Sequence, residues 1–170
     1  AARDGVGMHG VAYDANLANG RGLNAYGSGY LSALTSAMNY LAEGGARVIN
    51  NSWGGAPIYN YSKSWFETYQ PSSLINIRAA LEKDSLIVFA SGNSYANDPG
   101  SPAALPYFFP EFESHWLTVG ALSQSGNIAS FSNRCGVAAN YCIFAPGDAI
   151  TSTYNKGGYI SLNGTSMAAP

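Results

Sequence analysis

Apolar residues recur with the three-and-four spacing of a helix in two parts of the chain. Positions 31, 34, 37, 38, 41 and 42 are all apolar, which predicts a helix with one buried face. Gly44 and Gly45 are expected to end that helix, because glycine adopts a left-handed cap without steric cost. Leu74, Ile77 and Leu81 lie on related faces and predict a second helix over residues 72–83.

Short apolar runs predict the strands. Residues 85–90 (Ser-Leu-Ile-Val-Phe-Ala) form a nearly continuous run, which is typical of a strand covered on both sides in a parallel sheet. Further strands are predicted over residues 11–17, 46–52, 116–122, 142–144 and 159–162, the last two near a sheet edge. Because helices and strands alternate, the pattern indicates an α/β fold with right-handed crossovers.

The remaining segments lack a clear period. Residues 55–70 contain Pro57 and several aromatic residues, and we expect a surface loop or an insertion there. Residues 97–110 hold four prolines and are expected to be irregular. Residues 164–170 (Gly-Thr-Ser-Met-Ala-Ala-Pro) change to small residues and good helix formers, which indicates a turn from a strand into a helix. No repeat or linker divides the chain, so one continuous domain is predicted.

Composition narrows the class of protein. Of the 170 residues, 46% are hydrophobic and only 11% charged, which favours a globular chain over a disordered one. The formal net charge is -2 and no run of Lys or Arg is present, which argues against a nucleic-acid or anionic-membrane partner. No segment approaches the roughly 18 apolar residues of a membrane-spanning helix. The 20 glycines and 12 tyrosines favour an exported enzyme with many tight turns.

Three local patterns suggest chemistry, and each has a plain structural alternative. Ser166 lies in the first turn of the predicted C-terminal helix, two residues after Gly164, where free N–H groups favour negative charge. It is a candidate nucleophile, or else Thr165 or Ser166 is merely a helix cap. Asn93 follows the most buried strand and is a candidate oxyanion donor or part of an ordinary Gly-Asn turn. Residues 52–55 end a strand with two glycines and are suited to pairing with an extended peptide, or to a simple turn.

Together these patterns resemble one family. Residues 164–170 are similar to the nucleophile motif of subtilisin-like serine proteases, residues 90–93 to the family's oxyanion segment, and residues 49–55 to its substrate-binding strand. Residues 131–133, 145–147 and 150–153 resemble further family segments in the same order. The resemblance covers residues 5–170 and implies a three-layer α/β/α fold with a mostly parallel central sheet, incomplete at both ends. Residues 1–170 would be part of one peptidase domain.

The resemblance also assigns roles to residues. Ser166 would be the nucleophile, and the Asn93 side chain and the Ser166 N–H would stabilise the oxyanion. The polypeptide substrate would pair with Ser52, Trp53, Gly54 and Gly55. Ser91 and Gly92 would line the pocket for the residue before the scissile bond, and with Asn163 they suggest room for a medium or large apolar side chain. Trp53 stands where the family commonly has an aliphatic residue, which is expected to reshape a more distant subsite.

Cys135 and Cys142 lie seven residues apart. Spacing alone leaves a small disulfide loop and a pair of thiols equally open. The loop between them resembles bacterial autotransporter members of the family, which favours a disulfide and a secreted or cell-surface protein. The resemblance further implies a prosegment in the parent protein. It requires no cofactor or metal for the chemistry, although a structural calcium near Asp4 is a hypothesis.

The family's aspartate and histidine motifs are absent from the chain. His9 is expected in a loop, and His115 is expected to be structural. We therefore expect a piece of a longer protease, inactive by itself, because the serine lacks a base. One alternative is a non-catalytic peptide-binding or adhesin module, which has no need of both Ser166 and Asn93. The other is a serine-carboxyl peptidase, which Asn93 and the residues after Ser166 argue against.

Overall fold

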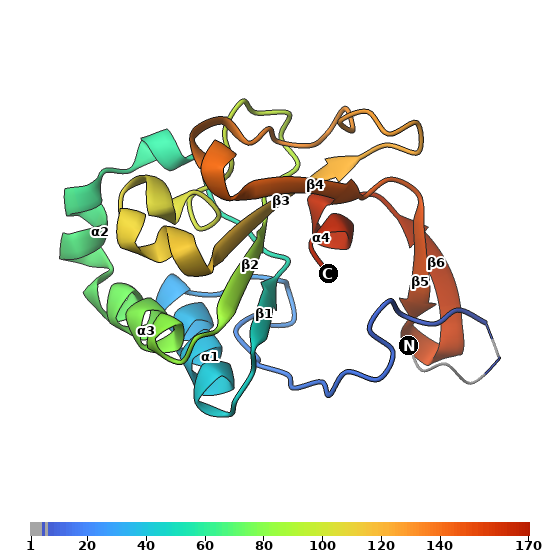
Figure 1. Ribbon diagram of the computed structural model, residues 1–170, viewed down its shortest axis with the longest axis horizontal. Coiled ribbons are helices and arrows are strands. Elements are labelled where there is room, and N and C mark those ends of the chain that lie inside the picture. Colours follow the sequence, from blue (N-terminus) through green and yellow to red (C-terminus); the bar gives the residue numbers. More distant parts are fainter. Residues whose placement is uncertain (1–4, 6) are drawn as a thin grey trace.

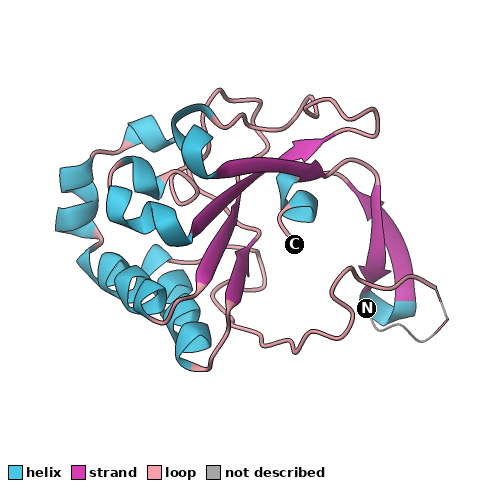
Figure 2. Cartoon of the chain, viewed as in Figure 1, coloured by secondary structure: helices cyan, strands magenta, loops and turns pink. Residues whose placement is uncertain are grey.

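The computed structural model describes residue 5 and residues 7–170, and it is built around a four-stranded parallel sheet (Figures 1 and 2). The strands lie in chain order: β1 (Val48–Asn51), β2 (Leu86–Ala90), β3 (Trp116–Leu122) and β4 (Cys142–Pro146). Ile49 pairs with Ile87, Phe89 with Thr118, and Val119 with Ile143. These strands confirm the predicted α/β fold, and β4 runs two residues beyond its predicted end.

Two helices cover one face of this sheet. They are α1 (Leu31–Glu43) and α3 (Pro71–Glu82), close to their predicted positions. Gly45 follows α1 with a φ of +86°, a left-handed conformation that suits glycine, and Pro71 opens α3 at a position where its missing N–H costs no hydrogen bond. Their apolar faces form the core together with the sheet, through Met38, Ala42, Leu74, Ile77, Ala80, Ile49, Ile87 and Phe89.

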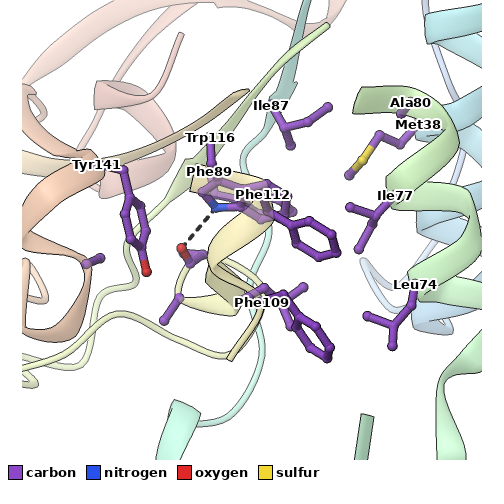
Figure 3. Close-up of a cluster of buried hydrophobic side chains, with 14 of the residues drawn as sticks. Met38, Leu74, Ile77, Ala80, Ile87, Phe89, Phe109, Phe112, Trp116 and Tyr141 are labelled. Carbon is purple, nitrogen blue, oxygen red and sulfur yellow. Dashed lines mark hydrogen bonds between the residues drawn. The ribbon is translucent and has the colours of Figure 1, made fainter. Parts of the chain in front are cut away.

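Aromatic rings extend this core (Figure 3). The Phe112 and Trp116 rings stack with centroids 6.0 Å apart, and Trp116 stacks in turn on Phe89 at 5.1 Å. The Trp116 indole N–H donates to the Ala103 carbonyl at 3.0 Å, so its one polar atom is satisfied inside the core. Three short 3₁₀ helices, η2 (Leu105–Tyr107), η3 (Pro110–His115) and η4 (Gly136–Tyr141), pack around these rings.

The opposite face of the sheet has a smaller covering. Side chains alternate along β2 and β3, so Val88, Val119 and Ala121 point to this face and contact Ala168 of α4 (Thr165–Ala168). Gly147, directly after β4, lies close to β3 and to the residue before α4, because a Cβ on it would lie 2.5 Å from the Ala121 Cβ and 2.8 Å from the Gly164 carbonyl oxygen. Helices therefore flank both faces, as the three-layer prediction requires.

Two predicted strands need correction. Residues 11–17 form turns and exposed coil, because polar turn formers such as Asp14 and Asn16 interrupt the apolar residues and the segment joins neither sheet. The strand predicted at 159–162 is β6 (Gly158–Leu162), which belongs to a separate antiparallel hairpin. Its partner β5 (Ile150–Tyr154) was missed, and η5 (Asn155–Gly157) joins them.

Residues 55–70 are not a loop. They form η1 (Ile58–Asn60) and α2 (Lys63–Tyr69), and Ile58 and Phe66 are buried in the core. Ser62 caps α2 by accepting the Trp65 N–H at 3.1 Å. Phe66, one of the aromatic residues that obscured the helical period in the sequence, is thus part of the core. Across the described chain, no helix has both the length and the apolar character needed to cross a membrane.

Candidate active site

Three chain segments meet at the carboxyl edge of the sheet. Residue 52 follows β1, residue 91 follows β2, and α4 begins at Thr165. The Ser166 hydroxyl donates to the Ser52 carbonyl at 3.2 Å, and the Ser52 hydroxyl donates to the Ser166 carbonyl at 3.0 Å. This reciprocal pair fixes the start of α4 against the end of β1, although the two residues are 114 positions apart.

Asn93 is oriented by Thr165. Its Oδ1 accepts the Thr165 N–H at 2.8 Å and the Thr165 hydroxyl at 2.9 Å, and the same hydroxyl accepts the Gly92 N–H at 3.2 Å. Because Thr165 holds the Asn93 Oδ1, the Nδ2 of the same amide is directed away from these Thr165 groups. A Cβ built on Gly164 would lie 3.6 Å from both Asn93 Nδ2 and the Ser166 backbone N. Both nitrogens therefore lie close to Gly164, and Asn93 and Ser166 line the same pocket.

A pocket of about 260 Å³ opens at this point. All eight residues predicted for catalysis and substrate binding line it: Ser52, Trp53, Gly54, Gly55, Ser91, Gly92, Asn93 and Ser166. The remaining lining residues are Ala90, Ser94, Gly100, Pro102, Ala103, Asn133 and Thr165. None of the lining side chains is charged, so the pocket offers no partner for an acidic or basic group. Asn163 is not among them, because it accepts the Ala149 N–H at 2.7 Å elsewhere.

The Gly54–Gly55 segment borders the pocket and is exposed. Within residues 7–170, neither glycine's backbone makes a hydrogen bond. The loop behind it is fixed, since Ser101 N–H donates to the Ala56 carbonyl at 2.8 Å and Ser101 Oγ would lie 2.9 Å from a Cβ on Gly55. A supported segment with unpaired backbone groups is suited to pairing with an extended peptide.

Trp53 turns inward next to this segment. Its indole N–H donates to the Asn51 Oδ1 at 3.1 Å, and its ring meets Phe89 edge to face with centroids 4.9 Å apart. Asn51 is itself buried and donates to the Ile49 and Val88 carbonyls. The Trp53 ring thus lines the pocket and packs against the core at the same time.

Sequence reasoning gave no role to Asn133 and treated Thr165 only as a helix cap. Both line the pocket and contact the segment around Asn93. The available signal was the position of Asn133 in one of the family-like segments, and nothing local showed which atoms it would contact.

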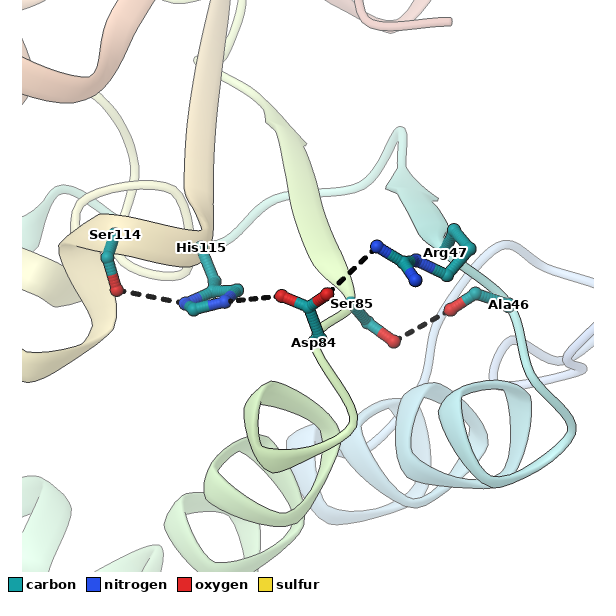
Figure 4. Close-up of polar contacts among 6 residues, drawn as sticks. All are labelled: Ala46, Arg47, Asp84, Ser85, Ser114 and His115. Carbon is teal, nitrogen blue, oxygen red and sulfur yellow. Dashed lines mark hydrogen bonds and ion pairs between the residues drawn. The ribbon is translucent and has the colours of Figure 1, made fainter.

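Neither histidine lines the pocket or is hydrogen-bonded to Ser166. His9 is exposed and meets the Tyr13 ring at 5.9 Å. His115 lies at the opposite end of the sheet, where its Nε2 is 3.0 Å from Asp84 Oδ1 and its Nδ1 is 2.9 Å from Ser114 Oγ (Figure 4). Arg47 also donates to Asp84, at 2.8 Å. Of the groups placed by the structure, no imidazole or carboxylate is hydrogen-bonded to the Ser166 hydroxyl.

Cys135 and Cys142 form a disulfide that closes η4 against the start of β4. The adjoining Val137 N–H donates to Asp98 Oδ1 at 2.9 Å. For metals, no group of three His, Cys, Asp or Glu side chains converges among the residues described. Asp4, the carboxylate of the calcium hypothesis, lies outside those residues.

The parallel sheet thus brings a serine, an amide donor and an unpaired backbone segment to one edge. Residues 1–170 match the subtilase family over the whole chain, and the protein belongs to that family. The chain is 33% identical to an extracellular serine protease of Serratia marcescens, over 100% of this chain and 21% of that protein. It is 35% identical to subtilisin DY of Bacillus licheniformis, over 97% of this chain and 54% of that protein.

The fold comparison agrees. The structure of sphericase matches with a TM-score of 0.76 and 29% identity, covering 98% of this chain and 55% of that one. The chain thus has the subtilisin-like α/β fold and spans between a fifth and just over half of these relatives.

Proposed function

We propose that the protein is a serine endopeptidase that cleaves polypeptides through an acyl-enzyme at Ser166. The observation that supports this proposal is the contact of Thr165 with Asn93, which holds the Asn93 amide in the same pocket as Ser166, with Asn93 Nδ2 and the Ser166 N both near Gly164. In the reaction, Ser166 Oγ attacks the scissile carbonyl carbon, and the developing oxyanion accepts hydrogen bonds from Asn93 Nδ2 and the Ser166 N–H. Such a donor contributes on the order of 10²–10³ in kcat, the range measured for a subtilisin asparagine.

The attack needs a base. We propose that a histidine oriented by an aspartate, outside the described residues, takes the Ser166 proton in the full-length protein and returns it to the leaving amine as the C–N bond breaks. Water then hydrolyses the ester with the same base. Family membership supports this part of the proposal, together with the names of the Serratia and Bacillus relatives.

The substrate follows from the shape and polarity of the pocket. An extended peptide pairs with the unpaired backbone of Gly54 and Gly55, and the side chain before the scissile bond enters the adjacent pocket. Because that lining is neutral, a medium or large apolar side chain is favoured there over an acidic or basic one. An extracellular relative supports secretion or display at the cell surface. We also propose that the full-length protein is synthesised with a prosegment and that a structural calcium binds near Asp4.

The test is labelling of the full-length protein with a fluorophosphonate, followed by mass-spectrometric mapping. An activated serine reacts with this probe, whereas an ordinary hydroxyl does not at a useful rate. We expect labelling confined to Ser166 and lost in Ser166→Ala, with kcat for a peptide substrate falling on the order of 10⁶-fold, the loss known for the subtilisin serine. A folded protein that binds peptide at Gly54–Gly55 without labelling would instead be a binding module.

A further inference from the structure

A buried asparagine in the pocket lining holds the segment that carries Asn93. Asn133 is 5% exposed and follows β3 by eleven residues. Its Oδ1 accepts the N–H groups of Ser94 at 2.9 Å and Ala96 at 3.1 Å, and its Nδ2 donates to the Ser91 carbonyl at 3.1 Å. One side chain thus binds the backbone on both sides of Asn93.

The backbone of Asn133 adds to this attachment. Its N–H donates to the Gly92 carbonyl at 2.9 Å, and its carbonyl accepts the Ser91 hydroxyl at 3.2 Å. Gly92 has a φ of +112°, and a Cβ on it would lie 2.5 Å from Asn133 Nδ2. The glycine is therefore required both for its backbone conformation and for the close approach of the amide.

Thr165 and Asn133 hold Asn93 in different ways. Thr165 binds the side-chain oxygen of Asn93 and the Gly92 N–H, whereas Asn133 binds backbone groups from residue 91 to residue 96. Asn93 itself is exposed, so packing does little to fix its position. A donor must lie within hydrogen-bond reach of the place where the oxyanion forms, and a displacement of about 1 Å can cost 10²-fold in rate.

We propose that Asn133 is a positioning residue that sets the Asn93 amide for the transition state and acts on the reaction through Asn93. This inference rests on the proposed function. It differs from a purely structural role in one respect: the cost of removing Asn133 should depend on the presence of the Asn93 side chain.

The experiment is a double-mutant cycle in the full-length protein, with kcat and KM measured on a peptide substrate and active enzyme counted by fluorophosphonate titration. We expect Asn133→Ala to lower kcat between 10-fold and 100-fold with KM changed less than about threefold, because the donor acts chiefly in the transition state. In the Asn93→Ala background the same substitution should lower kcat less than about threefold, because the positioned group is already gone.

A conservative variant separates positioning from folding. Asn133→Asp keeps the acceptor for Ser94 and Ala96 but sets a second acceptor oxygen against the Ser91 carbonyl, so we expect kcat to fall in this variant too, and to fall less than about threefold when Asn93 is already alanine. Asn127→Ala is the matched control, since Asn127 is exposed and bonds only within its own turn. It should keep wild-type kcat and KM.

Two results would overturn the proposal: wild-type kcat in folded Asn133→Ala, or an equal loss with and without Asn93. Should Asn133→Ala fail to fold, the same cycle is run with Asn133→Asp. Amide hydrogen exchange gives a readout that does not need activity, because Asn133→Ala should speed exchange at Ser94 and Ala96. If the wild type is neither labelled nor active, the proposed function fails, and unchanged exchange in the variant would separately reject the positioning role.

Discussion

The two faces of the sheet are built differently. On the face toward α1 and α3, large aromatic and aliphatic side chains pack into a continuous core in which Phe89, Phe109 and Phe112 are almost fully buried. On the face toward α4 the core consists of two valines and three alanines: Val88, Val119, Ala121, Ala129 and Ala168. Val48 and Ile143 on the flanking strands of that face remain 60% and 49% exposed.

Because the two faces are built differently, we expect one to contribute mainly to stability and the other to activity. Large side chains bury the most apolar area, so the aromatic face supplies most of the hydrophobic stabilisation. Small residues pack between α4 and the sheet on the other face, and Ser166 of α4 is hydrogen-bonded to Ser52 at the end of β1. We therefore expect substitutions on the aromatic face to alter stability alone, and those on the α4 face to alter activity as well.

The largest expected effect is on the aromatic face. Phe112→Ala removes a fully buried ring and should lower the free energy of unfolding by about 3–5 kcal/mol. At a temperature where the variant is folded, kcat should change less than about twofold, because Phe112 does not line the pocket. Urea unfolding and peptide hydrolysis of the full-length protein measure both quantities.

Val119→Ala is the matched variant on the α4 face. It should cost only about 2 kcal/mol of stability, yet it should lower kcat more than Phe112→Ala does, since the Val119 side chain packs in the cluster that contains Ala168 of α4. Equal effects of the two variants on kcat would contradict the separation of the faces.

An intermediate effect is expected from the disulfide, which lies where the two regions meet. Its loop places Ala138 and Tyr141 in the aromatic core, while Cys135 follows Asn133 by two residues. A loop of this size contributes about 2 kcal/mol by restricting the unfolded chain. The double substitution Cys135→Ser/Cys142→Ser should lower the urea midpoint accordingly, and a reductant should then have no further effect. A reductant that destabilised the double variant as much as the wild type would contradict this explanation.

Which parts of this arrangement were predictable depends on how local their signals are. The helix containing Leu74 and Ile77 and the strand at 86–90 carry their own period, and both were predicted within one or two residues. The helix α2 was missed because its seven residues are too short for a clear period, and the anchoring role of Phe66 appears only when the core is assembled.

The residues of the site also differ in how local their sequence signals are. Ser166, Asn93 and the Gly54–Gly55 segment have distinctive neighbours in the sequence, and the structure brings them to one pocket. Their catalytic roles stay predictions. The supports were not predictable, because Asn133 contacts Ser91 across 42 residues and Thr165 contacts Asn93 across 72. No spacing rule reveals such contacts, and they depend on the order of the strands in the sheet.

The smallest expected effect concerns an ion pair at the rim of the aromatic face. Arg78 of α3 donates to Glu111 Oε1 at 2.6 Å and lies over the Phe112 ring. Partial burial tends to raise the pKa of Glu111, but the backbone hydrogen bond and Arg78 outweigh it, and the net pKa is lowered. A lowered folded-state pKa contributes stability above the unfolded pKa, which is lost as the pH falls through the folded value. Because both side chains are about half exposed, we expect the ion pair to contribute less than about 1 kcal/mol to the free energy of unfolding.

Urea unfolding at pH 7 and pH 3 tests this expectation. The variant Glu111→Gln should be less stable than the wild type at pH 7 and nearly equal to it at pH 3. A difference in stability that persisted at pH 3 would contradict a charge effect. It would instead indicate that the packing of Arg78 on the aromatic core is responsible.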